Sequence, residues 1–165
     1  MRGKRARTTP PSEIMEQLSK LRPRVVPADV HQVVARHRLD RKMLRSTMQG
    51  LKEQKRFDLV GMVLSETLRS GCARVGAGDF STGISACARA KNWQLAMHLF
   101  DSMGKVKMLA NVISYNATIS ACEKGEQWQL AVHLFDGMRK AKVDPDVTSF
   151  STTVSACEKG AQWQM

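Results

Sequence analysis

Apolar residues follow a helical spacing twice within residues 112–146. A first helix is predicted by an apolar face at i, i+4 and i+7, formed by Tyr115, Ile119 and Cys122. Ser114 is placed to cap this helix and Gly125 to end it. A second helix is predicted by apolar residues at i, i+3, i+7 and i+10, namely Trp128, Ala131, Phe135 and Met138. Pro145 is expected to stop it, because proline has no amide hydrogen and restricts the preceding residue.

This helical hairpin recurs with a period of 35 residues. Residues 84–103 (ISACARAKNWQLAMHLFDSM) are identical to residues 119–138 at 13 of 20 positions, and residues 154–165 match residues 119–130 at 9 of 12. A fixed period in this range indicates a stacked-repeat protein. One hairpin cannot bury both of its faces, so neighbouring hairpins must stack into a solenoid with a continuous core.

At these residues the chain resembles the pentatricopeptide repeat (PPR) family in its P-type, 35-residue form. The matching elements are ISYNATISAC on the first helix, LAVHLFDGM on the second and the terminal VDPD. The 34-residue period and the W-x2-L-G-x2-Y signature of the tetratricopeptide repeat are not found. The resemblance implies a right-handed all-α solenoid of helix-turn-helix repeats.

The pattern divides the chain into five parts. Residues 1–40 form a basic leader with short helices expected around 12–21 and 29–38, and residues 41–76 form a degenerate repeat. Residues 77–111 and 112–146 are clear repeats, and residues 147–165 are a truncated one. In the degenerate part, one helical stripe is formed by Met43, Leu44, Met48 and Leu51, and the next by Val60, Val63, Leu64, Thr67 and Leu68. The truncated repeat suggests a fragment of a longer protein.

The charge of the chain is concentrated in its first third. The net charge is +11, and residues 1–60 hold 15 Lys and Arg against 6 Asp and Glu, compared with 11 against 9 in the remainder. This excess favours an anionic partner such as nucleic acid, with a solvated basic leader as the alternative. The start, MRGKRARTTPP, is Arg-rich and acid-poor like an organelle transit peptide, although Glu13 and Glu16 follow early. No apolar run suits secretion or a membrane span.

Cysteine and histidine repeat without forming a reactive cluster. Cys87, Cys122 and Cys157 recur at the same inner position of successive first helices. Neighbouring helix axes are ~8–10 Å apart, which is more than the Cα separation that a disulfide allows. We interpret the cysteines as small buried hydrophobes. His31 and His37 have no CxxC to complete a zinc site, so no metal and no cofactor is expected.

The repeated histidines and tryptophans receive structural interpretations. His98 and His133 have no base or nucleophile at a suitable spacing and are expected on the outer helix layer, so no residue is expected to be catalytic. Trp93, Trp128 and Trp163 are expected to anchor each second helix against its own first helix.

A positive charge ends each first helix. Arg89, Lys124 and Lys159 stand two residues after the repeated cysteine. Such a row can contact a phosphate backbone. The alternative is an interaction with the negative end of the helix dipole, and the two interpretations are compatible.

Two positions in the repeat carry polar residues that vary between otherwise similar repeats. Ser81, Asn116 and Ser151 follow the aromatic residue of each first helix, and Asn111 and Asp146 close the two complete repeats. The resemblance implies that these positions form base-reading pairs. By that analogy, Ser81 with Asn111 resembles an adenine reader and Asn116 with Asp146 a uracil reader. Ser151 lacks its partner and would prefer a purine if that partner were Asn or Asp.

The second residue of each repeat completes the implied site. Ile113 and Thr148 resemble the side chains that sandwich bases in the family, while Gly78 stands at the equivalent place in the first clear repeat. An Asn side chain offers both a donor and an acceptor, as a uracil edge requires, and single-stranded RNA exposes such edges. The alternative for all of these positions is a solvated polar edge.

These observations predict a non-enzymatic protein that binds single-stranded RNA, one base per repeat. The resemblance implies work in a mitochondrion or chloroplast, in processing, editing, stability or translation of transcripts, with other proteins of an RNA-processing complex as further partners. No membrane and no small-molecule substrate is expected. The competing hypothesis is a helical scaffold for protein–protein interaction, whose concave face would carry apolar or charged anchors instead of Ser, Asn and Asp.

Overall fold

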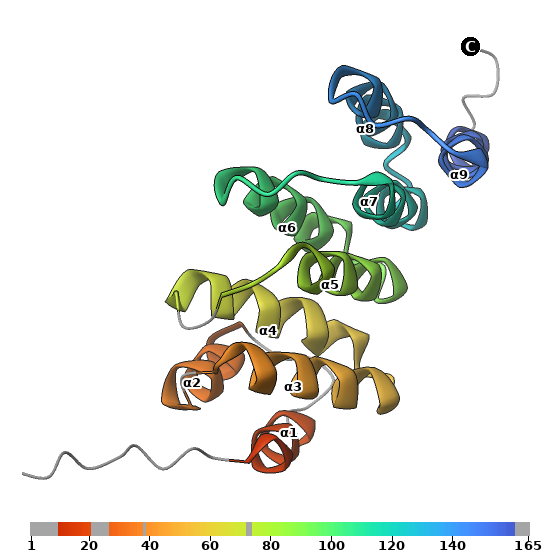
Figure 1. The fold of residues 1–165 in the computed structure, drawn as a ribbon. Helices are drawn as coiled ribbons and strands as arrows, with labels where there is room; N and C mark the ends of the chain where they lie inside the picture. Colours follow the sequence, from red (N-terminus) through yellow and green to blue (C-terminus); the bar gives the residue numbers. More distant parts are fainter. Residues whose placement is uncertain (1–9, 21–26, 38, 72–73, 161–165) are drawn as a thin grey trace, which may run out of the picture. The chain divides into compact units, whose positions relative to one another are not determined.

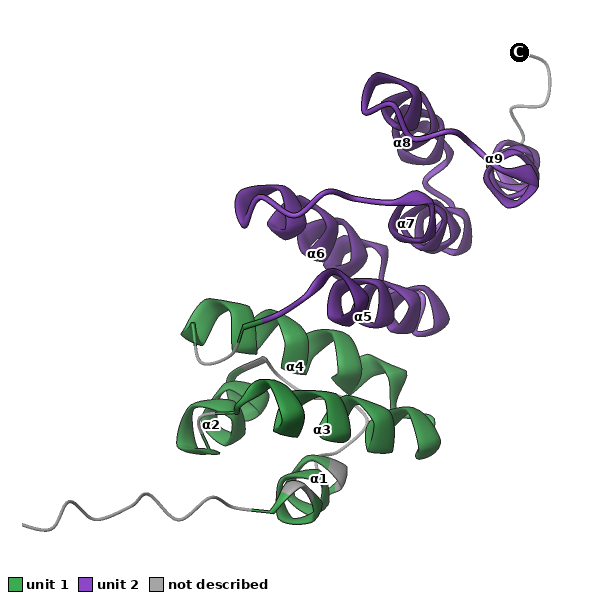
Figure 2. Ribbon diagram, viewed as in Figure 1, with its two compact units in different colours: residues 1–74 green, residues 75–165 purple. Residues whose placement is uncertain are grey.

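The computed structural model describes residues 10–20, 27–37, 39–71 and 74–160. Within these residues all regular secondary structure is α-helical, as predicted. The chain divides into two compact units, residues 1–74 and 75–165 (Figure 2). The boundary lies two residues before the predicted start of repeat 77–111.

Unit 1 consists of two helical pairs. They are α1 (Pro11–Ser19) with α2 (Pro27–His37), and α3 (Arg41–Glu53) with α4 (Phe57–Ser70). Helix α1 packs on α2 and α3, and α4 packs on α2 and α3 (Figure 1). The two short helices predicted in the leader are confirmed, with starts one or two residues earlier, and Pro27 is the first residue of α2, where its missing amide hydrogen is harmless. Both predicted apolar stripes of α3 and α4 are buried, except for the partly exposed Leu68.

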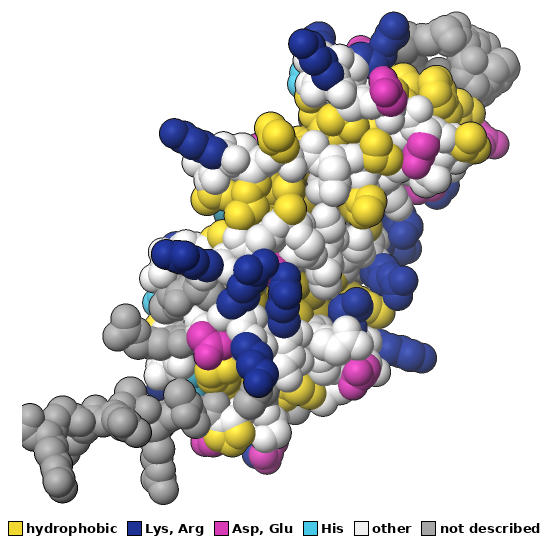
Figure 3. Space-filling model, in the orientation of Figure 1, with side chains coloured by type: hydrophobic (Ala, Val, Ile, Leu, Met, Phe, Trp, Pro, Cys, Tyr) yellow, Lys and Arg dark blue, Asp and Glu magenta, His cyan; other side chains and the backbone are white. Residues whose placement is uncertain are grey.

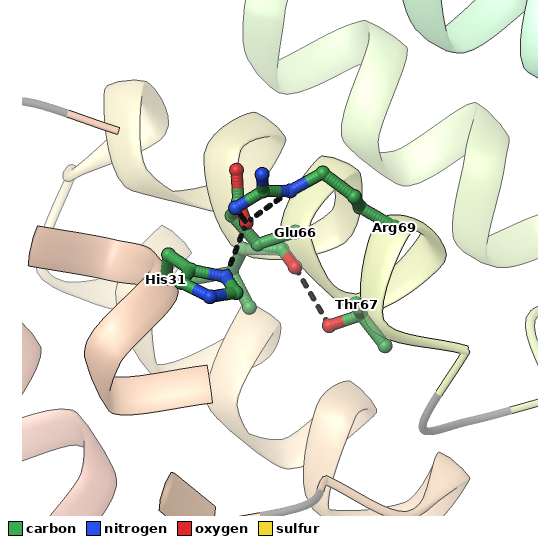
Figure 4. A network of polar contacts seen from close by, with 5 residues as sticks. His31, Glu66, Thr67 and Arg69 are labelled. Atoms are coloured by element: carbon green, nitrogen blue, oxygen red, sulfur yellow. Dashed lines mark hydrogen bonds and ion pairs between the residues drawn. The ribbon is translucent and has the colours of Figure 1, made fainter. Parts of the chain in front are cut away.

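A buried carboxylate links α2 to α4 in unit 1 (Figure 4). Glu66 of α4 is buried, and its Oε2 lies 3.0 Å from Nδ1 of His31 on α2. The same oxygen accepts from Nη2 of Arg69 at 2.8 Å and from its Nε at 3.0 Å. Burying a charge is costly unless it is paired, so these contacts are what allow Glu66 to lie between the helices.

Unit 2 contains the clear repeats. Helices α5 (Ala77–Arg89), α7 (Val112–Lys124) and α9 (Val147–Lys159) are first helices, and α6 (Trp93–Lys105) and α8 (Trp128–Lys140) are second helices. The first helices pack side by side, α7 between α5 and α9, while α6 also packs on α7 and α8 on α9 (Figure 1). Edge-to-face aromatic pairs join successive repeats. The ring centroids of Phe100 and Tyr115 are 4.8 Å apart, and those of Phe135 and Phe150 are 4.9 Å apart. The predicted solenoid of stacked helical hairpins is thus confirmed.

The last residue of each complete repeat is the N-cap of the next first helix. Oδ1 of Asn111 accepts from the amide of Ser114 at 3.0 Å, and Oδ1 of Asp146 accepts from the amide of Ser149 at 2.8 Å. These are N-cap bonds, which satisfy amides that have no partner within the helix. The prediction that Ser114 caps its helix is therefore wrong, since α7 begins at Val112 and Ser114 is its third residue. The predicted end at Gly125 is confirmed.

A left-handed residue follows each of α5, α6, α7 and α8 in unit 2. Lys91, Lys107, Glu126 and Lys142 all have φ between 56° and 58°. At the end of α8, this conformation lets the amide of Val143 donate to the carbonyl of Met138 at 2.9 Å. The prediction that Pro145 stops this helix is wrong, because α8 already ends at Lys140.

Each described tryptophan contacts the following repeat. The indole of Trp93 lies against Gly125 at the end of α7, and that of Trp128 lies against Gly160 at the end of α9. A Cβ at either glycine would overlap the indole ring. This contact was not predicted, since each tryptophan was expected to pack against its own first helix. Trp163 lies outside the described residues.

In the part of the chain that the structure describes, no helix combines the length and apolar character needed to cross a membrane.

Candidate nucleic-acid interface

Asn116 and Asp146 belong to the same repeat and meet where α7 lies beside the start of α9. Asn116 lies in the second turn of α7, and Asp146 precedes the first turn of α9, which packs beside α7. Nδ2 of Asn116 donates to Oδ1 of Asp146 at 3.0 Å. The structure therefore brings this predicted pair into direct contact, with both residues reaching the surface.

A serine that the sequence analysis missed completes this contact. Oγ of Ser149 lies 2.6 Å from Oδ1 of Asn116 and 3.0 Å from Oδ1 of Asp146, and it accepts from the amide of Asp146 at 3.1 Å. Ser149 has no exposed surface. The available signal was a serine three residues after Asn111 and again after Asp146, of which only Ser114 was interpreted, as a possible helix cap.

The other predicted pair is joined through the equivalent serine. Oγ of Ser81 on α5 lies 3.1 Å from Oγ of Ser114, which donates to Oδ1 of Asn111 at 3.1 Å. Ser81 also has the carbonyl of Ala77 as an acceptor at 3.1 Å. Ser81 and Asn111 are thus connected through the buried Ser114. Ser151 is exposed and donates to the carbonyl of Thr148 at 3.2 Å, within its own helix.

The electrostatics of the Asn116 pair are set by Asp146. Donation from the backbone amide of Ser149, and then from the side chain of Asn116, holds the pKa of the Asp146 carboxyl below its usual value. Asp146 is consequently ionised at neutral pH and can only accept hydrogen bonds.

The predicted base-sandwiching residues lie on the same surface as the predicted base-reading residues. Ile113 is 63% exposed and stands three residues before Asn116, hence on the same face of α7. Thr148 is also exposed and stands three residues before Ser151 on α9. An exposed isoleucine one turn from an amide offers an apolar surface to a flat ring.

The predicted cations end the first helices, but their surroundings differ. Nζ of Lys159 lies 2.7 Å from Oε1 of Glu123, which also accepts from Oγ of Ser155 at 3.1 Å. This ion pair joins residues 36 positions apart and was not predicted. One repeat earlier, Ala88 occupies the place of Glu123, and Lys124 forms no ion pair within the described residues. Lys124 lies eight residues after Asn116, about 12 Å further along the helix axis.

The other candidate residues have structural surroundings. Cys87 and Cys122 are buried free thiols as predicted, and burial raises their pKa values to about 12 and about 11. Cys157 is only partly buried. The exposed side chains of His98 and His133 lie on the second helices α6 and α8, as expected.

The two leader histidines do not approach a metal-binding cluster. His31 contacts Glu66, and Nε2 of His37 lies 3.1 Å from Oε1 of Gln17. Among the described residues, no three His, Cys, Asp or Glu side chains are grouped to hold a metal ion.

Known repeat families match the part of the chain that carries these contacts. Residues 74–126 match the pentatricopeptide repeat domain and residues 110–159 match the PPR repeat family. The chain belongs to the pentatricopeptide repeat family. The two pairs of side chains above therefore lie within PPR repeats. No curated protein matches the sequence.

Solved PPR structures share the fold. The crystal structure of the pentatricopeptide repeat protein PPR10 in complex with an 18-nt psaJ RNA element matches with a TM-score of 0.61 and 24% identity, covering 81% of this chain. A crystal structure of a triple Cys-to-Ser variant of PPR10 with the same RNA element gives the same values. The aligned part is 20% of PPR10, so this chain spans about a fifth of that protein's length.

Proposed function

We propose that this PPR chain binds single-stranded RNA without catalysing a reaction, and that each complete repeat reads one base. One recurring arrangement carries the proposal. In two repeats, 35 residues apart, a polar side chain on a first helix is joined by hydrogen bonds to the N-cap residue of the next first helix. Asn116 contacts Asp146 directly, and Ser81 contacts Asn111 through Ser114. The presence of RNA in the matched PPR10 structures supports the same partner.

The base assignments follow from the groups presented. Asn116 has a donor and an acceptor, which suits a uracil edge. The hydroxyl of Ser81 has one proton, which it can donate to the carbonyl of Ala77 or to Oγ of Ser114. Its oxygen can then accept a hydrogen bond from a base that donates, such as from the amino group of adenine. Ile113 and Thr148 are placed to sandwich the base read by Asn116. Ser151 is the reading residue of a third site.

Phosphate contacts complete the proposed interface. Arg89, Lys124 and Lys159 present one cation at the end of each first helix of unit 2. Lys124 and Asn116 are about 12 Å apart along α7, so the proposed phosphate contact and base reading are at different levels of the same helix. With base stacking worth ~1–3 kcal/mol per nucleotide, two or three sites give affinities near the high micromolar to millimolar range.

The cellular setting is part of the proposal. We place the chain in a mitochondrion or chloroplast, acting in processing, editing, stability or translation of transcripts beside other RNA-processing proteins. The basic start of the sequence, with Arg2, Lys4, Arg5 and Arg7, supports import. Import of the labelled chain into isolated organelles, compared with a chain lacking residues 1–11, tests this point, and equal import of both would contradict a role for that segment.

Nuclear magnetic resonance titration tests the RNA-binding function. The ¹⁵N-labelled full chain is titrated with the hexanucleotides rU6, rA6 and rC6, and shifts are expected first at residues 111–116 and 146–151. Asn116→Ala should weaken rU6 binding, whereas the matched control Gln129→Ala, on the exposed surface of α8, should not. Absence of shifts at millimolar RNA, or equal effects of both variants, would contradict the proposal.

The exposed surface of α9 provides a test of the scaffold alternative. Val147, Phe150 and Val154 form an exposed apolar face on α9, which lies where apolar side chains reach the surface in Figure 3. If RNA produces no shifts and this face instead mediates binding to a protein, the scaffold hypothesis replaces RNA reading.

A further inference from the structure

A buried serine from the following repeat contacts each reading residue. Ser149 reaches Asn116 and Ser114 reaches Ser81, in both cases from 33 residues further along the chain. Both serines have no exposed surface, so neither can touch RNA directly. Whatever they contribute to base reading must act through the reading side chain.

Hydrogen-bond polarity fixes the orientation of the Asn116 amide. An ionised Asp146 can only accept, so the atom of Asn116 at 3.0 Å from it must be the amide nitrogen. The carbonyl oxygen of the amide then faces Ser149 at 2.6 Å. That oxygen can only accept, and Oγ of Ser149 is closer to it than to Oδ1 of Asp146 at 3.0 Å, so Ser149 donates its single hydroxyl proton to Asn116. The amide is therefore held from both sides.

This orientation matters for choosing between the two pyrimidines. Uracil presents a ring N3–H donor beside the O4 acceptor, whereas cytosine presents a ring N3 acceptor beside the N4 amino donor. An Asn amide complements either base, but in orientations that differ by a 180° flip. A freely flipping Asn116 would accept both bases, while a fixed amide accepts one.

We propose that Ser149 is a positioning residue that fixes the amide of Asn116, so that this site discriminates uracil from cytosine. Ser114 has the corresponding role for Ser81, where its contact helps to occupy the hydroxyl proton. The reading unit is thus three residues from two repeats: the reading side chain, the cap and the third residue of the next first helix. This inference rests on the proposed RNA-binding function and adds a residue outside the predicted pair.

The test compares rU6 with rC6 on the full chain, using the side-chain amide resonance of Asn116 to obtain a site-specific Kd. The natural chain should bind rU6 more tightly than rC6, by roughly fivefold or more for one base-specific contact. Ser149→Ala should lower that ratio by roughly two- to tenfold, the worth of one hydrogen bond. Asp146→Asn retains a cap like Asn111, and together with Ser149→Ala it should bring the ratio to about one.

Thr153→Val is the matched control. Thr153 is buried one turn further along α9 and donates to the carbonyl of Ser149 at 2.7 Å, so the variant removes a buried hydroxyl that does not contact Asn116. Its rU6-to-rC6 ratio should equal that of the natural chain. Failure of the natural chain to discriminate would overturn the proposed base reading itself. Discrimination that survives Ser149→Ala unchanged would overturn only the positioning role.

A measurement on the natural chain covers the case in which Ser149→Ala does not fold. The heteronuclear ¹H–¹⁵N Overhauser effect of the Asn116 side-chain amide should report an ordered group in the absence of RNA. The exposed side chain of Gln129 provides the mobile reference. Equal mobility of the two amides would mean that Asn116 is not held, and the proposal would fail.

Discussion

Asp146 and Asn111 each serve two helices at once. Each caps the first helix that follows it, and each is linked to the proposed reading residue of the preceding first helix. Asn and Asp are preferred helix caps in any protein. Their identity alone therefore does not reveal a role in base reading, which explains why the sequence needed the family resemblance to suggest one.

At the residue scale, exchanging one reading pair for the other should exchange the preferred base. Asn116→Ser with Asp146→Asn recreates around Ser149 the set formed by Ser81, Ser114 and Asn111. The cap is preserved, since Asn111 already caps α7. We expect the preference at this site to change from uracil to adenine, by ~1–3 kcal/mol. Titration with rU6 and rA6, followed at residues 112–116, measures the change.

The corresponding reverse exchange provides the control. Ser81→Asn with Asn111→Asp should move the first site towards uracil without altering the second. If both double variants bind all tested bases as the natural chain does, neither pair reads a base.

The lowered pKa of Asp146 gives the contact a defined pH range. A carboxyl whose pKa is lower in the folded state stabilises that state at pH values above its usual pKa, near 3.9. This contribution to the free energy of unfolding is lost as the pH falls through the lowered pKa. We therefore expect the Asn116 side-chain amide and the Ser149 backbone amide to keep their resonances from pH 7 to about 4 and to shift together below it. The same transition should be absent in Asp146→Asn; its persistence there would assign it to another group.

At the element scale, two glycines should respond oppositely to alanine. A Cβ at Gly125 would overlap the indole of Trp93, so Gly125→Ala should destabilise the chain by ~1–3 kcal/mol. Gly104 lies within α6 with nothing near its missing Cβ, so Gly104→Ala should stabilise by ~0.4–1 kcal/mol. Urea unfolding followed by circular dichroism measures both. A neutral Gly125→Ala would show that the tryptophan contact is readily rearranged.

The same elements show how far the sequence predicts the fold. The 35-residue period and the apolar spacing were sufficient for both helices of each repeat, because burial of one face imposes that spacing. The helix ends were not predictable in the same way, since Lys142 adopts a left-handed conformation that lysine does not favour on its own. Ser149 was missed because its role depends on a neighbour 33 residues away, which a local pattern does not contain.

At the scale of the whole molecule, the row of cations is uneven. Lys159 is paired with Glu123, while the equivalent partner of Lys124 is replaced by Ala88. The ion pair is only partly exposed, since 49% of the Lys159 side chain but 14% of the Glu123 side chain is accessible. Lys159 can exchange Glu123 for a phosphate, but doing so leaves a carboxylate beside the RNA backbone. The two lysines should therefore contribute differently to binding, although their positions in the repeat are identical.

The salt dependence of rU6 binding separates these contributions. Each phosphate contact made by a cation adds ~0.7 to the slope of log K against log salt for a single strand. Lys124→Ala should lower the slope by about that amount, and Lys159→Ala by less, because its charge is already balanced by Glu123. Conversely, Glu123→Gln should tighten binding and steepen the slope, since it releases Lys159 and removes the opposing charge. Equal slopes for the natural chain and all three variants would place this row of cations outside the RNA interface. An equal decrease of the slope in the two lysine variants would show that the ion pair with Glu123 does not restrain Lys159.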